Sequence, residues 1–217
     1  MWTALELPSI PYMLYDELDV SMPPSVMKMM LRVTGRLFGA APCQLENMPL
    51  GDIRRDAQLE MSDGSLRPAP GHRTADVVRF TTTFNTGRLY LRVLTRDTGE
   101  INQRFVIRRA GTLFTIYLNR PVVDGEKQGA SAIFLYEDVQ PRSCPGLDYV
   151  VQDKRHRTVV SIPRRCIGSP RWVRTGVTTF RDADRSDPGQ SGWVDDAGRR
   201  YHYRAGQTKL GPRVFAG

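Results

Sequence analysis

Cysteine, histidine and long apolar runs are scarce in this chain of 217 residues, which holds three cysteines and three histidines. No stretch approaches the roughly 18 consecutive apolar residues of a membrane-spanning helix, so we expect no transmembrane segment. The first 20 residues lack a basic start and carry acids where a secretory signal has its apolar core, so they do not predict a signal peptide.

Motifs of common enzymes are also missing. The histidines, His72, His156 and His202, lie outside any HExxH, CxxC or HxH pattern, which argues against a catalytic zinc site. No phosphate-binding loop, dinucleotide-binding glycine pattern or GxSxG elbow occurs. We therefore expect no metal and no cofactor, and assign no catalytic residue. A hydrolase remains an alternative, because His156 or His202 could meet an acid from a distant position.

Residues 182–187 carry oxygen-bearing side chains at alternate positions, which suits Ca²⁺. An EF-hand loop starting at Asp182 would need glycine where Asp187 stands and glutamate where Trp193 stands. The pattern fails, and a solvated loop is expected. Asp195 and Asp196 could add calcium ligands, or could instead pair with nearby arginines.

Short runs rich in Val, Ile, Thr, Phe and Tyr follow one another from residue 76 to residue 180. Within them apolar residues alternate, as with Leu89, Leu91 and Val93, and Gly, Asp or Pro separates the runs every 8–12 residues or so. This pattern predicts a mainly β protein, an antiparallel, jelly-roll-like β-sandwich with an N-terminal arm and one helix. The expected strands are residues 76–84, 87–96, 101–109, 111–120, 130–138, 146–153, 157–163 and 171–180.

The first 75 residues lack the alternating apolar pattern of the later segments. Residues 1–24 lack periodicity and predict an irregular arm, after which Ser25 is a plausible N-cap for a helix that ends near Phe38. An alternative for the segment from Met27 is an export signal, which its two arginines disfavour. Residues 40–75 predict a connecting loop. We therefore divide the chain into residues 1–74, an arm with a short helix and a linker, and residues 75–217, a β-sandwich domain.

The net charge of +8 is unevenly distributed along the chain. Residues 1–140 hold 16 basic and 16 acidic residues, whereas residues 141–217 hold 15 basic and 7 acidic ones. A basic C-terminal third favours an anionic partner, although a solvated basic face is the alternative. No nucleic-acid-binding motif is present, so nucleic acid is the less favoured partner. The candidate anion-binding residues are Arg164, Arg165, Arg171, Arg174, Arg199, Arg200, Tyr201 and Tyr203.

Cys144 and Cys166 flank a predicted hairpin, in which strands 147–152 and 158–163 are joined by a charged turn. An antiparallel pair returns the chain to its starting end, so the two sulfurs could come close enough to bridge. Two free thiols in a reducing compartment fit the same spacing. The spacing alone leaves both alternatives open.

The stretch SIPRRCIGSPRWVRTGV, with ADVVRF upstream and WVDDAG and LGPRV downstream, resembles a largely uncharacterised group of secreted β-sandwich proteins from actinobacteria. The similarity covers about residues 75–217 and is strongest from Cys144 to Val177. The resemblance implies an exported sandwich with a Cys144–Cys166 disulfide, and offers no catalytic residues. On this basis Pro163, Gly168 and Pro170 end one strand and launch the next, and Trp172 is expected in the core beside the disulfide.

These observations favour a non-catalytic, extracytoplasmic β-sandwich module that binds or decorates a surface through its basic C-terminal third. The expected partner is an anionic polymer or a protein surface, and the expected location is the extracellular space or the cell surface. A structural protein of a phage particle is an alternative, in which the N-terminal arm assembles with other subunits after cytoplasmic synthesis.

Overall fold

The chain divides into two compact units, Met1–Gln44 and Leu45–Gly217. The computed structural model describes residues 48–51, 55–73, 75–136, 140–182, 190–198 and 207–217, all of which belong to the second unit. The predicted arm and helix therefore lie outside the described residues, as do residues 183–189 of the expected solvated loop and the residues Arg199, Arg200, Tyr201, His202 and Tyr203.

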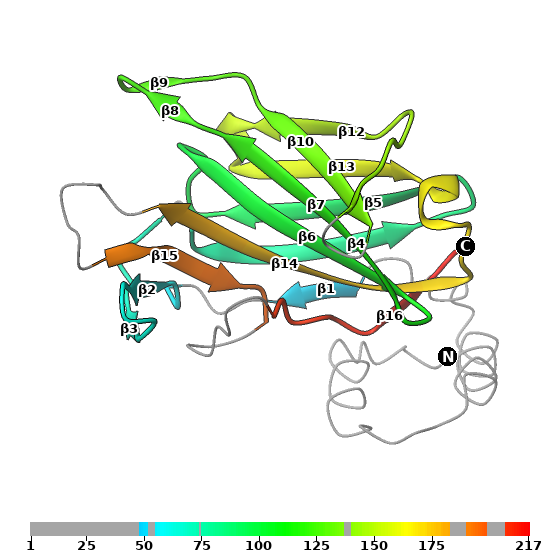
Figure 1. The fold of residues 1–217 in the computed structure, drawn as a ribbon, viewed down its shortest axis with the longest axis horizontal. Helices are drawn as coiled ribbons and strands as arrows, with labels where there is room; N and C mark the ends of the chain where they lie inside the picture. Colours follow the sequence, from blue (N-terminus) through cyan, green and yellow to red (C-terminus); the bar gives the residue numbers. More distant parts are fainter. Residues whose placement is uncertain (1–47, 52–54, 74, 137–139, 183–189, 199–206) are drawn as a thin grey trace, which may run out of the picture. The chain divides into compact units, whose positions relative to one another are not determined.

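The second unit consists of antiparallel β-strands (Figure 1). The described residues include no helix with the length and apolar character that crossing a membrane requires. Two short 3-10 turns, η2 (Asp153–Arg155) and η3 (Arg164–Ile167), connect strands. The strands are β1 (Met48–Gly51), β2 (Gln58–Met61), β3 (Leu66–Pro68), β4 (Val77–Phe84), β5 (Arg88–Thr95), β6 (Ile101–Arg109), β7 (Thr112–Arg120), β8 (Val122–Val123), β9 (Glu126–Lys127), β10 (Ser131–Tyr136), β11 (Gln140–Pro141), β12 (Asp148–Gln152), β13 (Arg157–Pro163), β14 (Trp172–Asp182), β15 (Gln190–Asp196) and β16 (Arg213–Phe215).

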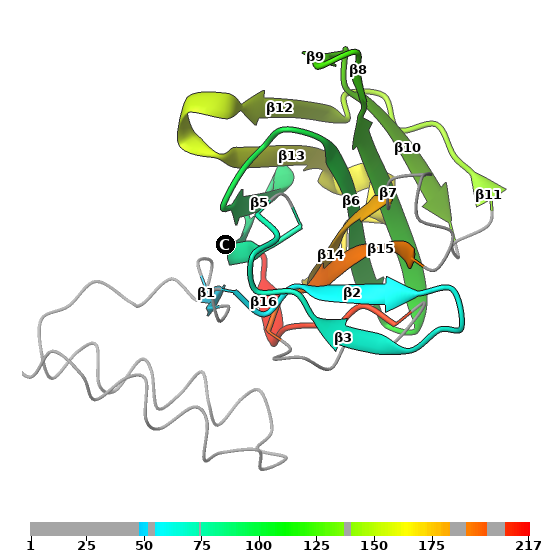
Figure 2. The ribbon, with the colours of Figure 1, turned by 90° about the vertical axis from the view of Figure 1, so that its left-hand side faces the viewer.

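The strands form two main sheets. One has the order β1-β4-β5-β13-β12. The other has the order β11-β10-β7-β6-β14-β15-β2-β3, with β16 paired to the first residues of β14. The hairpin β8–β9 forms a separate two-stranded ribbon (Figure 2).

The core consists of side chains from both sheets. The alternation predicted for residues 87–96 holds in β5, where Leu89, Leu91 and Val93 are fully buried. The rings of Phe80 on β4 and Phe105 on β6 lie 6.5 Å apart, which joins the two sheets through one apolar cluster. Alternate residues of β5 enter this cluster, and the intervening Tyr90, Arg92 and Leu94 are only partly buried.

All eight strands predicted between residues 76 and 180 are present, within a few residues of their expected ends. The predicted hairpin is confirmed, since β12 and β13 pair from Asp148↔Ser161 to Gln152↔Arg157. The prediction of a loop over residues 40–75 is wrong in part. β1 pairs with β4 and β2 pairs with β15, although their short sequences show little alternation and depend on partners far along the chain.

The shared core makes a direct stability prediction. Replacing Phe105 by alanine should lower the free energy of unfolding by about 3–5 kcal/mol, because a fully buried ring is lost and a cavity remains. Urea unfolding followed by fluorescence measures this change. Ile133→Ala is the control, because Ile133 is 56% exposed and its truncation should cost less than about 1 kcal/mol. Equal losses for the two variants would contradict this placement of the core.

Candidate functional site

A disulfide between Cys144 and Cys166 joins the segment before β12 to the turn η3, with their Cα atoms 5.5 Å apart. It closes one end of the β12–β13 hairpin and confirms the pairing that the resemblance implies. Pro163 ends β13, and Gly168 follows η3 with a φ of 72°, so the chain turns there before β14 begins. The disulfide and η3 therefore fix the chain at this end of the strands.

Arginines from distant parts of the sequence gather at this end. They lie at strand ends and turns of both sheets, and we call this region the arginine end. Its members are Arg88, Arg108, Arg109, Arg142, Arg164, Arg165, Arg171, Arg174 and Arg213. Several guanidinium groups donate hydrogen bonds to backbone carbonyls: Arg88 to Gly146, Arg109 to Ile167, Arg164 to Pro170, Arg165 to Pro145 and Arg174 to Gly211.

Three of these arginines lie side by side across adjacent strands. Arg174 on β14 is the direct register partner of both Arg108 on β6 and Arg213 on β16, and all three side chains are exposed. We call this row the arginine ladder. Like charges at directly opposed positions destabilise a sheet, so the ladder is not explained by strand pairing.

Trp172 contributes to the arginine ladder rather than to the core. The guanidinium of Arg213 lies 4.3 Å from the centre of the Trp172 ring, a cation–π contact. The prediction of a buried Trp172 is wrong, because the alternation of β14 points Val173 inward and its neighbours Trp172 and Arg174 outward.

Ion pairs between described residues gather at the opposite end of the strands, which we call the ion-paired end. They are Arg96–Asp76, Arg120–Asp153, Lys127–Asp153 and Arg181–Glu100. Asp153 accepts hydrogen bonds from Arg120, Lys127 and Thr98, and the Arg120 contact is the main cause that holds its pKa well below the usual range. Among described residues, Asp148 is the acid at the arginine end, and its carboxylate accepts the backbone N–H of Tyr149.

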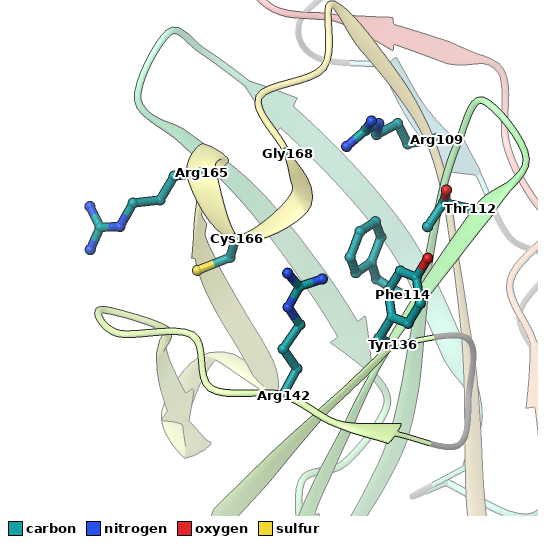
Figure 3. Close-up of a pocket in the computed structure, with 8 residues that line it drawn as sticks. All are labelled: Arg109, Thr112, Phe114, Tyr136, Arg142, Arg165, Cys166 and Gly168. Carbon is teal, nitrogen blue, oxygen red and sulfur yellow. The ribbon is translucent and has the colours of Figure 1, made fainter.

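A pocket of about 230 Å³ opens beside the disulfide (Figure 3). Its lining is Arg109, Thr112, Phe114, Tyr136, Arg142, Arg165, Cys166 and Gly168, which includes no carboxylate. Arg142 lies over the ring of Tyr136, with its guanidinium carbon 5.5 Å from the ring centre. A Cβ at residue 168 would overlap the Arg109 guanidinium, so glycine at this position allows Arg109 to lie across the turn.

The structure places the predicted residues Arg164, Arg165, Arg171 and Arg174 at the arginine end and adds five arginines that sequence reasoning missed. Arg88, Arg108 and Arg109 belong to the part of the chain that is neutral by count, and Arg142 and Arg213 stand apart from the basic segments considered. One signal could have found two of them: Arg108 and Arg109 precede a tight turn between two predicted strands, where charged residues reach a sheet end.

The histidines do not form a catalytic pair in the described part of the chain. His156 is exposed and lines a second pocket of about 360 Å³ together with Arg55, Arg73 and Arg96. The described residues that line this pocket include no acid. His72 instead stacks on Trp193, with ring centres 4.3 Å apart. Burial, aided by the charge of Arg181, lowers the pKa of His72 to about 4.

Three buried aspartates, Asp56, Asp76 and Asp195, bring carboxylate oxygens within 4.8 Å of one another, a cluster that the sequence did not suggest. Asp76 forms an ion pair with Arg96 and accepts the backbone N–H of Arg55, and Asp195 accepts the N–H of Val77. Asp196, considered as a calcium ligand, accepts the N–H of Lys209.

No family model, curated protein or solved structure matches this chain. The resemblance of residues 75–217 to secreted actinobacterial sandwich proteins therefore stays a prediction. What the structure confirms of its implications is the antiparallel β architecture and the Cys144–Cys166 bridge.

The disulfide predicts both a thiol count and a stability change. Alkylation of the unfolded, unreduced chain should modify one cysteine, and alkylation after reduction should modify all three. Because the bridge spans 22 residues, replacing both cysteines by serine should lower the free energy of unfolding by about 3 kcal/mol. Mass spectrometry and urea unfolding measure these effects. Three modified thiols before reduction would rule the bridge out.

His72 predicts a pH dependence of stability. Its pKa is near 6.5 in the unfolded chain and about 4 in the folded chain, so the unfolded state binds the proton more readily between these values. The contribution of neutral His72 is therefore complete above pH 6.5 and is lost as the pH falls toward 4. Wild-type protein should lose more stability than His72→Gln between pH 7 and pH 4. Parallel profiles would contradict this environment for His72.

Proposed function

We propose that residues 45–217 form a non-catalytic β-sandwich module that binds an anionic polymer of the cell exterior through the arginine end. The observation that carries the proposal is the segregation of charge along the strands. Ion pairs between described residues lie at one end, whereas the other end gathers arginines that make no ion pair with a described carboxylate.

This segregation favours binding over a merely solvated surface. A polyanion that lies across the arginine ladder neutralises the repulsion between Arg108, Arg174 and Arg213, which the free protein must bear. Several guanidinium groups are already oriented by backbone carbonyls, so less side-chain freedom is lost on binding. An arginine-rich surface that forms no ion pair with a described carboxylate is suited to sulfate, phosphate or carboxylate groups.

The disulfide supports an extracytoplasmic setting for this module. Disulfides persist in oxidising compartments and are rare in the cytosol. Cell-surface and extracellular polymers are the polyanions of such a compartment. Nucleic acid is the less favoured partner, since neither the sequence nor the described surface presents a nucleic-acid-binding motif.

The proposal predicts salt-sensitive binding to an anionic matrix. The association constant for heparin should fall as the salt concentration rises. Exchange of Arg108, Arg174 and Arg213 for glutamine should make this dependence shallower, by up to about 0.9 in the slope of log K against log salt for each lost contact. Heparin-affinity elution and a fluorescence titration at several NaCl concentrations measure the change.

The matched control removes three exposed cations from the ion-paired end: Arg79, Lys154 and Arg155, each to glutamine. Net charge then falls by the same amount in both variants. Binding weakened only by the ladder variant supports the arginine end as the site. Equal weakening would show a response to net charge alone, and wild-type protein that is not retained at low salt would overturn the proposal.

A further inference from the structure

The pocket beside the disulfide differs from the flat arginine ladder in being a partly open hollow that several segments border. Arg109 ends β6, Thr112 begins β7, Tyr136 ends β10, and Arg142 follows β11. The guanidinium groups of Arg109 and Arg142 reach the pocket from two sides, whereas that of Arg165 points away from it (Figure 3). Two cations thus converge on one small space, and the described residues that line it include no carboxylate.

Most hydrogen-bond donors of this pocket are uncommitted within the described part of the chain. A guanidinium has five N–H donors. Arg109 donates from one of its nitrogens, Nη1, to the carbonyl of Ile167 at 2.9 Å. The guanidinium of Arg142 contacts a ring face and donates no hydrogen bond to a described residue. The hydroxyls of Thr112 and Tyr136 likewise have no described partner. The pocket therefore offers several donors that a ligand with acceptor oxygens can use.

We propose that this pocket binds one tetrahedral oxyanion, the phosphate or sulfate group of a monoester, through Arg109 and Arg142 with the hydroxyls of Thr112 and Tyr136. The inference rests on the proposed function in one respect, because it names the chemical group of the anionic polymer that the arginine end recognises. The phosphate or sulfate of a monoester presents three terminal oxygens in different directions. Two guanidinium groups that approach from separate walls can donate hydrogen bonds to these oxygens at the same time.

The size of the pocket favours a single head group. Its volume of about 230 Å³ equals that of seven or eight water molecules at about 30 Å³ each. Pockets for drug-sized ligands are larger, at about 300–1,000 Å³. A phosphate or sulfate enters such a space, and the remainder of the molecule stays at the surface among the other arginines of this end.

Contacts with the surrounding backbone fix the position of Arg109 and of the pocket wall. Gly168 lets Arg109 lie across the turn, and the carbonyl of Ile167 fixes its guanidinium. The disulfide fastens Cys166 on one wall to Cys144, two residues after Arg142. The disulfide and the hydrogen bond to Ile167 therefore hold the segments that carry these two cationic side chains on either side of the pocket, which favours a bound anion.

Isothermal titration calorimetry of the full chain at constant ionic strength tests the proposal, with inorganic phosphate, inorganic sulfate, glycerol phosphate and acetate as probes. Phosphate, sulfate and glycerol phosphate should bind saturably with one site per chain, and acetate at least tenfold more weakly. Arg142→Gln should weaken phosphate binding about tenfold or more, since it removes charge-assisted hydrogen bonds. Arg142 is exposed and its side chain donates to no described residue, so this variant should fold normally.

Arg79→Gln is the matched control, because it removes one exposed arginine from the ion-paired end and should leave phosphate affinity unchanged. Absence of saturable phosphate binding would overturn the proposed anion site in the pocket, while heparin retention by the same protein would leave the polymer proposal standing.

Saturable phosphate binding without retention on any anionic matrix would overturn the polymer proposal instead. Phosphate bound with glycerol phosphate excluded would overturn the assignment of a monoester. Equal loss in both variants would show that charge alone, and not the pocket, attracts phosphate.

Discussion

Every pair of neighbouring strands in the two main sheets runs antiparallel, and the position of each charged side chain depends on this constraint. Antiparallel strands return the chain to the same end at every second turn. Arg88, Arg109 and Arg164, which stand far apart in the sequence, therefore lie at one end, while the turns that hold Asp97 and Asp153 lie at the other. The separation of an arginine end from an ion-paired end follows from strand register rather than from composition.

Repulsion between neighbouring arginines destabilises the arginine end, and nearby backbone carbonyls and aromatic rings partly offset it. Opposed arginines repel, and no described ion pair relieves them. Backbone carbonyls from η3, from the segment before β12 and from residues 210–211 accept guanidinium donors instead. Aromatic faces at Trp172 and Tyr136 add cation–π contacts. These interactions orient the arginines without neutralising them, which leaves their charge available to an external anion.

Much of the fold could be predicted because its strands carry a strong period of two. The alternation in residues 87–96 and the hairpin closed by Cys144 and Cys166 are local patterns, and both are confirmed. β1 and β2 were missed, since β1 pairs with β4 and β2 pairs with β15, which come later in the chain; β3 was missed with them, because it pairs with β2. Trp172 was assigned to the wrong face, because its bulk suggested the core while the alternation of β14 directs it outward.

For the candidate site, the sequence by itself determined the residue types, the strand periodicity and a basic C-terminal segment that includes Arg164, Arg165, Arg171 and Arg174. Only the tertiary structure decided that Arg108, Arg109 and Arg142 join them and that the ion-paired acids Asp76, Glu100 and Asp153 lie at the far end. The physical reason is that charge counted along the chain averages over both ends of every strand. Electrostatic potential instead depends on distance in space, which strand pairing sets.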